Sequence, residues 1–200
     1  MTKYPDYNRA TNAAYEALSN YEGNFPQIDI FEIVLSYRNI RIHTYSDIAE
    51  SNKIAIDEFV STLAPSEYGF TIYDKENHRY LIFFNDTKID TTIRFTIAHE
   101  FGHIVLEHQE DGKVEDKEAD CFARNLLCPV PIRDELGLVT TEDYCAAFDI
   151  SSRAAKVAID KKSNDSYYIT RTNYNTLNDK VYCYFSGCTL RELYGFEYGY

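Results

Sequence analysis

The chain has 200 residues, of which 44% are hydrophobic and 26% are charged, and its formal net charge is −12. This composition indicates a soluble globular protein of one domain, or one domain with a small appendage, that can bury a core. It excludes a membrane-spanning helix, because no run of about 18 apolar residues occurs, and the acidic surface argues against direct binding of nucleic acid.

Export signals and disulfide patterns are not found in this sequence. The first residues, Met1–Asp6, lack the apolar stretch of a secretory signal. The five cysteines follow no regular spacing, which is typical of reduced thiols rather than of a disulfide framework. We therefore expect the chain to act in the cytoplasm.

The N-terminal part of the chain predicts helices. Apolar residues recur at helical spacing over residues 8–20. The same spacing recurs from Pro26 to about Tyr37, where the proline is expected to open the helix.

Strands are predicted next along the chain. Alternating apolar residues over Ile40–Tyr45 predict one strand, and residues 51–60 predict a short helix after it. The runs Phe70–Tyr73 and Tyr80–Phe84 are rich in β-branched and aromatic residues and are separated by a polar turn. This arrangement predicts a β-hairpin.

The second half of the chain again predicts helices. Ile93–Glu107 is apolar on most sides, and residues 115–128 form a second helix that Pro129 ends. Two shorter helices are expected at 141–148 and 151–161. After a linker at 161–166, a tyrosine-rich tail predicts a few strands and turns.

The helix Ile93–Glu107 contains polar residues that a buried helix does not accommodate without partners. His99 and His103 are four residues apart, so their rings lie on one face and can bind one Zn²⁺ at about 2.0–2.1 Å. Glu100 points about 100° further round the axis and can reach a metal-bound water. Gly102 leaves room for a closely packed neighbouring element. This is the H-E-x-x-H pattern of zinc peptidases.

A catalytic zinc also needs a third protein ligand and an open position. His108 follows His99 by nine residues, whereas the metzincin pattern needs ten and an intervening glycine. We therefore predict His108 to be a residue at the end of the helix, near its C-terminal dipole. The next helix offers four carboxylates: Glu115, Asp116, Glu118 and Asp120.

Two segments resemble the ImmA/IrrE-type metallopeptidases of mobile elements and stress regulons. They are Arg94–Leu106, which contains the H-E-x-x-H pattern, and Glu118–Pro129. Ile82–Asp86 is similar to that family's strand ending in Asn-Asp, and Asp149–Ala155 is similar to a later helix of the family. The resemblance extends over about residues 10–160.

The resemblance implies a choice among the carboxylates. The family's ligand glutamate lies three residues before the alanine of the second segment, and counting back from Ala119 gives Asp116. The family pattern makes Asp120 a partner that orients a zinc-bound histidine. Glu118 is the alternative ligand, and Glu115, or the absence of a third carboxylate, also stays open.

These residues predict a mechanism of zinc-dependent hydrolysis. Zinc is expected to lower the pKa of its bound water toward about 7, and Glu100 to take the proton and pass it to the leaving amine. The strand that ends at Asn85 is expected to align the substrate by pairing along its edge.

We expect an α+β fold with a zincin-like minimal metallopeptidase core, in which a small sheet accompanies the H-E-x-x-H helix and a second ligand-bearing helix. This core takes residues 1–130, followed by a helical extension over 131–162 and a tyrosine-rich β-type tail over 163–200. The resemblance implies a zinc endopeptidase that cleaves a cognate helix-turn-helix repressor and thereby derepresses a mobile element, phage or stress regulon. The alternative is a zinc-containing regulatory binding protein that does not cut, such as a toxin–antitoxin-type partner.

Overall fold

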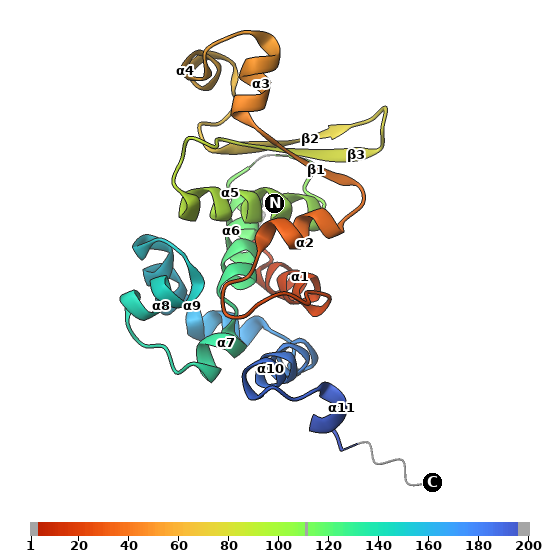
Figure 1. Ribbon diagram of the computed structural model, residues 1–200, viewed down its shortest axis with the longest axis vertical. Coiled ribbons are helices and arrows are strands. Elements are labelled where there is room, and N and C mark those ends of the chain that lie inside the picture. The colour runs from red at the N-terminus through yellow and green to blue at the C-terminus, as the bar shows by residue number, and fades with distance from the viewer. Residues whose placement is uncertain (1–3, 111, 196–200) are drawn as a thin grey trace.

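The computed structural model describes residues 4–110 and 112–195 of the chain. It has the predicted α+β composition, with helices on both sides of a small sheet (Figure 1). The strands are β1 (Ile40–Thr44), β2 (Gly69–Asp74) and β3 (Arg79–Phe84). The helices, together with the short π-helix η1 (Phe59–Leu63), are α1 (Tyr7–Ser19), α2 (Ile30–Ser36), α3 (Tyr45–Asn52), α4 (Ile56–Glu58), α5 (Asp90–Val105), α6 (Lys113–Leu127), α7 (Val130–Glu135), α8 (Thr141–Phe148), α9 (Ser152–Tyr168), α10 (Arg171–Ser186) and α11 (Leu190–Leu193).

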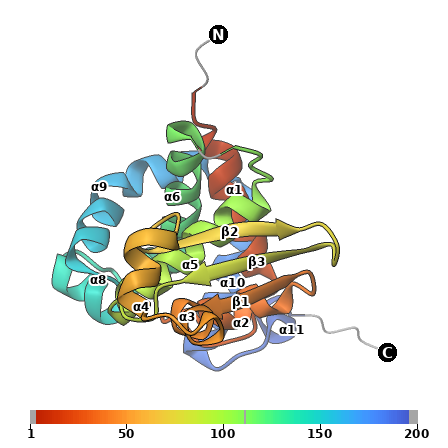
Figure 2. The same cartoon turned by 90° about the horizontal axis from the view of Figure 1, so that it is seen from above.

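The sheet has the strand order β1-β3-β2, with β1 parallel and β2 antiparallel to β3. The predicted hairpin is confirmed, and Tyr73 lies opposite Tyr80 within it. Because β3 is paired along both edges, the prediction that the strand ending at Asn85 aligns a substrate by edge pairing is wrong. Of the two hairpin strands, β2 is the one at the edge of the sheet. Figure 2 shows this edge on the side toward α6 and α9.

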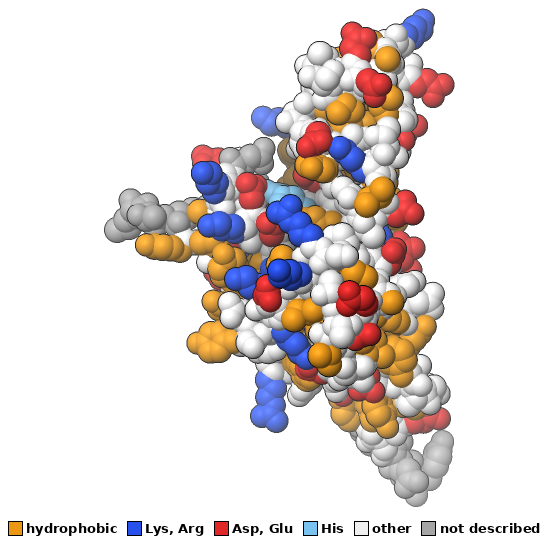
Figure 3. Space-filling model, turned by 90° about the vertical axis from the view of Figure 1, so that its left-hand side faces the viewer, with side chains coloured by type: hydrophobic (Ala, Val, Ile, Leu, Met, Phe, Trp, Pro, Cys, Tyr) orange, Lys and Arg blue, Asp and Glu red, His pale blue; other side chains and the backbone are white. Residues whose placement is uncertain are grey.

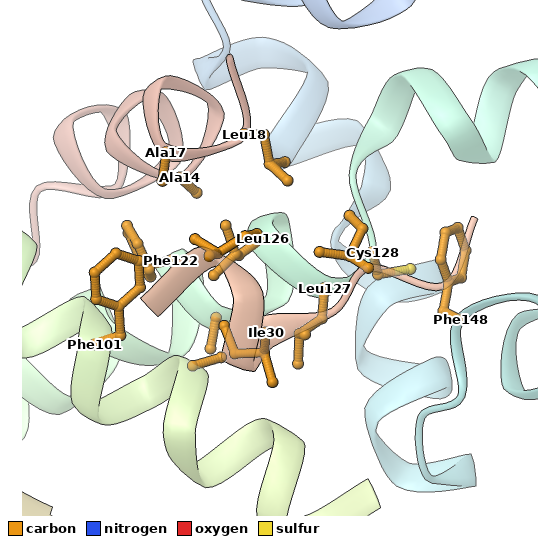
Figure 4. Packing of buried hydrophobic residues seen from close by; sticks show 14 of the residues in the cluster. Ala14, Ala17, Leu18, Ile30, Phe101, Phe122, Leu126, Leu127, Cys128 and Phe148 are labelled. Atoms are coloured by element: carbon orange, nitrogen blue, oxygen red, sulfur yellow. The ribbon is translucent and has the colours of Figure 1, made fainter. Parts of the chain in front are cut away.

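The core lies between α5, α6 and α1, below the sheet in the view of Figure 1. Figure 4 shows Phe101 of α5 and Phe122 of α6 beside each other, and their ring centroids are 5.5 Å apart in an edge-to-face arrangement. Leu126 continues the same buried face of α6, and Leu18 of α1 packs there too. These apolar contacts fix the position of α6 relative to α5.

Gly102 allows α5 and α6 to approach closely, as predicted. A Cβ atom added at Gly102 would lie 3.0 Å from Cδ1 of Phe122 and 3.3 Å from the Cα atom of Ala119. These distances leave no room for a side chain. The two helices that carry the predicted site residues therefore pack backbone to backbone at this point.

The second helix begins later than predicted. It starts at Ile30 rather than Pro26, and its N-cap is Asp29, whose side chain accepts hydrogen bonds from the backbone N–H groups of Phe31 and Glu32. An aspartate that satisfies two otherwise unpaired N–H groups decides the helix start more strongly than a nearby proline does.

The C-terminal part is helical, so the predicted linker at 161–166 and the predicted β-type tail over 163–200 are wrong for the residues described. Helix α9 runs through the linker, and α10 follows at once, capped by Thr170. Leu177 and Val181, one helical turn apart, are buried. Tyrosine and threonine content favours strands only weakly, and burial of this helical face overrides it. Residues 196–200 of the predicted tail lie outside the described part.

Within the described ranges, no helix is both long enough and apolar enough to cross a lipid bilayer.

The close α5–α6 contact predicts that Gly102→Val destabilises the fold. Its side chain would displace Phe122 or the backbone at Ala119, and overpacking of this kind typically costs about 1–3 kcal/mol. We expect the free energy of unfolding, measured by urea denaturation, to fall by about 2 kcal/mol. Ala146→Val on the exposed face of α8 is the matched control. Equal stability of the two variants would contradict the packing described.

Candidate metal centre

Three potential metal ligands lie together where α5 passes α6. His99 and His103 project from successive turns of α5, and Asp116 projects from the first turn of α6. One ligand atom from each residue lies within 4.8 Å of the other two. The Nε2 atoms of the two histidines are 3.1 Å apart, and Nε2 of His103 is 3.8 Å from Oδ1 of Asp116.

The ring of His99 is oriented by Asp120. Nδ1 of His99 lies 3.0 Å from Oδ1 of Asp120. A carboxylate only accepts, so Nδ1 carries a proton and donates it, and Nε2 faces Nε2 of His103. Burial lowers the pKa of His99, but the hydrogen bond and the charge of Asp120 outweigh burial, and the pKa is raised. Asp120 thus lies where the predicted orienting residue was expected.

The ring of His103 is held by a chain of hydrogen bonds that leads away from the site. Its Nδ1 lies 3.0 Å from Nδ1 of His108, and Nε2 of His108 lies 2.9 Å from Oε2 of Glu118. The other carboxylate oxygen of Glu118 accepts a 2.7 Å hydrogen bond from the backbone N–H of Asp6. In the neutral form of His108, Nε2 donates to Glu118 and Nδ1 accepts from Nδ1 of His103. His103 then keeps a lone pair on Nε2.

The pKa of His103 agrees with this assignment. Burial and the neighbouring His99 and His108 rings lower it to about 4. His103 is therefore neutral at pH 7, and a neutral imidazole is the form that binds a metal.

The arrangement fits a divalent cation. The two Nε2 atoms and the carboxylate of Asp116 face one another here, and the two Nε2 atoms lie within hydrogen-bonding distance. Such a cluster of ligand atoms needs a positive charge among its members, either the proton of an imidazolium His99 or a metal cation in its place. Ligands at about 2.0–2.1 Å in tetrahedral geometry are roughly 3.3 Å apart, close to the 3.1 and 3.8 Å found here. The role of these three residues as ligands stays a prediction.

The other carboxylates weighed as ligands are directed elsewhere. Glu118 is buried with His108, with side-chain exposures of 6% and 5%, and both its oxygens are engaged as described. The buried side chain of Glu115 lies against Gly112, where an added Cβ would be 2.7 Å from Oε2. Asp116, by contrast, is exposed beside His103.

His108 is closer to the site than the sequence predicts. It follows the end of α5, and its backbone N–H donates to the carbonyl of His103 at 3.0 Å. Glu107 adopts a positive φ of 53°, which turns the chain back on itself. The prediction of a residue near the helix end is correct in position, but its contact with His103 was missed. No spacing rule signals this contact, because it depends on that turn and on α6.

Glu100 lies on the neighbouring side of α5, against the sheet. Its Oε2 accepts a 2.9 Å hydrogen bond from the hydroxyl of Thr71 in β2. Glu100 and His99 line a cleft of about 700 Å³ bounded by α5, α6, the start of β2 and α9. Figure 3 shows histidine surface in a hollow on this face of the molecule. The carboxylate that sequence analysis predicts to be the base thus lies in an open cleft beside the three acceptors.

The geometry predicts that Asp116→Ala loses bound zinc. Removing one of three protein ligands leaves two imidazoles, and we expect less than half a zinc per chain after dialysis against a weak chelator, measured by mass spectrometry. Asp160→Ala, an exposed change on α9, should keep the wild-type zinc content. If Asp116→Ala keeps it as well, Asp116 is not a ligand.

Glu118 is expected to support the fold of the site rather than to bind metal. Glu118→Ala leaves the buried His108 N–H and the Asp6 N–H without acceptors, which should cost about 3 kcal/mol of unfolding free energy in the metal-free protein. Chelator-treated protein in urea gives this value directly. Glu110→Ala in the exposed loop should change stability by less than about 0.5 kcal/mol. A similarly small change for Glu118→Ala would refute the buried hydrogen-bond chain.

Comparison with known proteins supports a peptidase. Residues 59–129 match the model of the Peptidase_M78 family, described as the IrrE N-terminal-like domain. This segment includes the hairpin, α5 and α6, and therefore the three candidate ligands and Glu100. A search of the curated proteins found no match. Residues 59–129 are thus similar to the IrrE N-terminal-like peptidase domain, and the predicted resemblance to the ImmA/IrrE family of metallopeptidases is confirmed.

Proposed function

We propose that the chain is a zinc-dependent endopeptidase with a zincin-like core. His99, His103 and Asp116 would hold the zinc ion, and the H-E-x-x-H glutamate, Glu100, would act as the base. The observation that carries this proposal is the meeting of two imidazole nitrogens and a carboxylate within 4.8 Å of one another, beside a second carboxylate in an open cleft. The peptidase family match supports the same reaction class.

Each residue would have a separate task. A bound zinc supplies Lewis acidity, which polarises the scissile carbonyl and makes water a stronger nucleophile. Glu100 would take a proton from the attacking water and deliver it to the leaving amine. The hydroxyl of Thr71 donates to Glu100 and so directs the carboxylate. Asp120 and the His108–Glu118 pair hold the two rings with their lone pairs inward.

The substrate backbone would lie along β2. In the described part of the sheet, β2 pairs with β3 alone, so its other edge presents free N–H and C=O groups. Tyr68 and Gly69, at the start of β2, line the cleft together with Glu100. An extended peptide added to this edge would pass the site, as in other forms of β-augmentation.

The proposed substrate is a cognate helix-turn-helix repressor, whose cleavage would derepress a mobile element or stress regulon. This follows from the family resemblance. Such a repressor is met in the cytoplasm, where we propose that the chain acts. The alternative of a binding protein that does not cut is disfavoured by the position of Glu100, which lines the cleft together with His99.

The test is Glu100→Gln. Glutamine can still accept from Thr71 but cannot take a proton, so we expect cleavage to fall by about 10²- to 10⁴-fold with zinc content unchanged. Zinc-loaded protein is incubated with the helix-turn-helix repressor encoded beside it, and the products are measured by intact mass. Glu142→Gln, exposed on α8, and a chelator-treated sample are the controls. Wild-type cleavage by zinc-loaded Glu100→Gln would contradict the mechanism, and a complex without cutting would favour the binding protein.

A further inference from the structure

Basic side chains gather around the cleft although the chain as a whole has a net charge of −12. Four of the residues lining it are basic and three are acidic. Figure 3 shows Lys and Arg side chains around the histidine surface on this face. The basic residues are Lys117 and Arg124 of α6 and Arg153 and Lys161 of α9. The cleft therefore differs in charge from the rest of the molecule.

The acidic side chains of the cleft already have partners. Glu100 accepts from Thr71, and Asp120 accepts from His99. Asp165 is completely buried between two guanidinium groups. These carboxylates make contacts inside the protein or lie beside the proposed metal. They therefore offset little of the positive charge of the basic groups at the mouth of the cleft.

The exposed basic side chains, by contrast, have no acidic partner in the described part of the chain. Lys117, Arg153 and Lys161 are exposed, and none of them makes an ion pair with a described residue. Nearby Lys162, which does not line the cleft, is paired with Asp134 at 2.7 Å. An unpaired cation in a concave site attracts an anion more strongly than one on a convex surface.

The buried cluster behind α6 adds to the positive charge. Arg124 binds Asp165 through two hydrogen bonds of 2.6 and 3.0 Å, and Arg133 binds the same carboxylate at 3.2 Å. One carboxylate between two guanidinium groups leaves one positive charge unbalanced. Arg133 is fully buried and its Nη2 has no hydrogen-bond partner, whereas Arg124 reaches the cleft wall.

Two of the exposed basic residues lie along one face of helix α9. Arg153, Val157 and Lys161 are successive residues of one helical face and all line the cleft. Val157 is 41% exposed, so an apolar contact lies between two basic ones. A peptide passing between β2 and α9 would meet this row with its side chains.

We propose that the cleft selects peptide segments with carboxylate side chains, which lie against α9 and contact Arg153 and Lys161. This extends the proposed function by naming the substrate class, but recognition can be measured without cleavage. A nucleic acid would also satisfy the basic groups, but the strongly acidic remainder of the chain would repel its long phosphate backbone. A short acidic segment needs only the cleft.

Binding to zinc-loaded Glu100→Gln tests the proposal without proteolysis. The probes are fluorescein-labelled peptides, (Ala-Glu-Leu-Glu)₃ and its glutamine counterpart (Ala-Gln-Leu-Gln)₃, followed by fluorescence anisotropy. We expect the acidic peptide to bind roughly 3- to 10-fold more tightly, and the difference to shrink as salt rises from 50 to about 500 mM. Equal binding of the two peptides would overturn the proposal.

Two charge-reversal variants test whether the preference for the acidic peptide comes from the cleft. Lys161→Glu in the same background should abolish the preference for the acidic peptide, while Lys156→Glu, exposed on the same helix but outside the cleft, should keep most of it. Both variants change net charge equally, and circular dichroism shows whether each is folded. An equal loss in both variants would mean that overall charge, not the cleft, governs binding, and this would overturn the proposal. Tighter binding of a dT12 oligonucleotide than of the acidic peptide would assign the cleft to nucleic acid and would overturn it too.

The proposed function fails separately. If the protein prefers the acidic peptide but does not cleave the repressor, only the proposed peptidase function is contradicted.

Discussion

The site depends on where the protons of two imidazole rings are directed. Asp120 accepts a hydrogen bond from Nδ1 of His99, and His108, itself bound to Glu118, is hydrogen-bonded to Nδ1 of His103, so that both Nε2 atoms face inward toward Asp116. Three such groups at this separation need a positive charge among them in a partly buried site. Other contacts hold the three residues in place, so a metal cation can replace the proton of an imidazolium His99.

Those contacts come from distant parts of the chain. The packing of Phe101 against Phe122, together with the absence of a side chain at Gly102, sets the distance between α5 and α6. The backbone N–H of Asp6, just before α1, fixes Glu118, and through it the ring of His103. The start of the chain is therefore coupled to the proposed metal centre, although it lies outside the segment that matches the peptidase family.

The parts of the site that sequence reasoning anticipated are those set by helical spacing. His99, Glu100 and His103 need only one helix to be placed, whereas Asp116 and Asp120 on the next helix were chosen from the family resemblance. The link from His103 through His108 to Glu118 was missed because it requires the reversal at Glu107 and the packing of α6. In the tail, tyrosines and threonines suggested strands, but the buried side of α10 and the anchoring of Asp165 between two arginines make it helical. These are tertiary effects that local propensity does not contain.

X-ray absorption at the zinc edge of the zinc-loaded wild-type protein tests the arrangement of the three acceptors most directly. The structure predicts one zinc ion with two imidazole nitrogens and a carboxylate oxygen, all at about 2.0–2.2 Å. Scattering from sulfur at about 2.3 Å would place the zinc on cysteine thiolates instead. That result, or a signal with fewer than two imidazoles, would contradict the proposed centre.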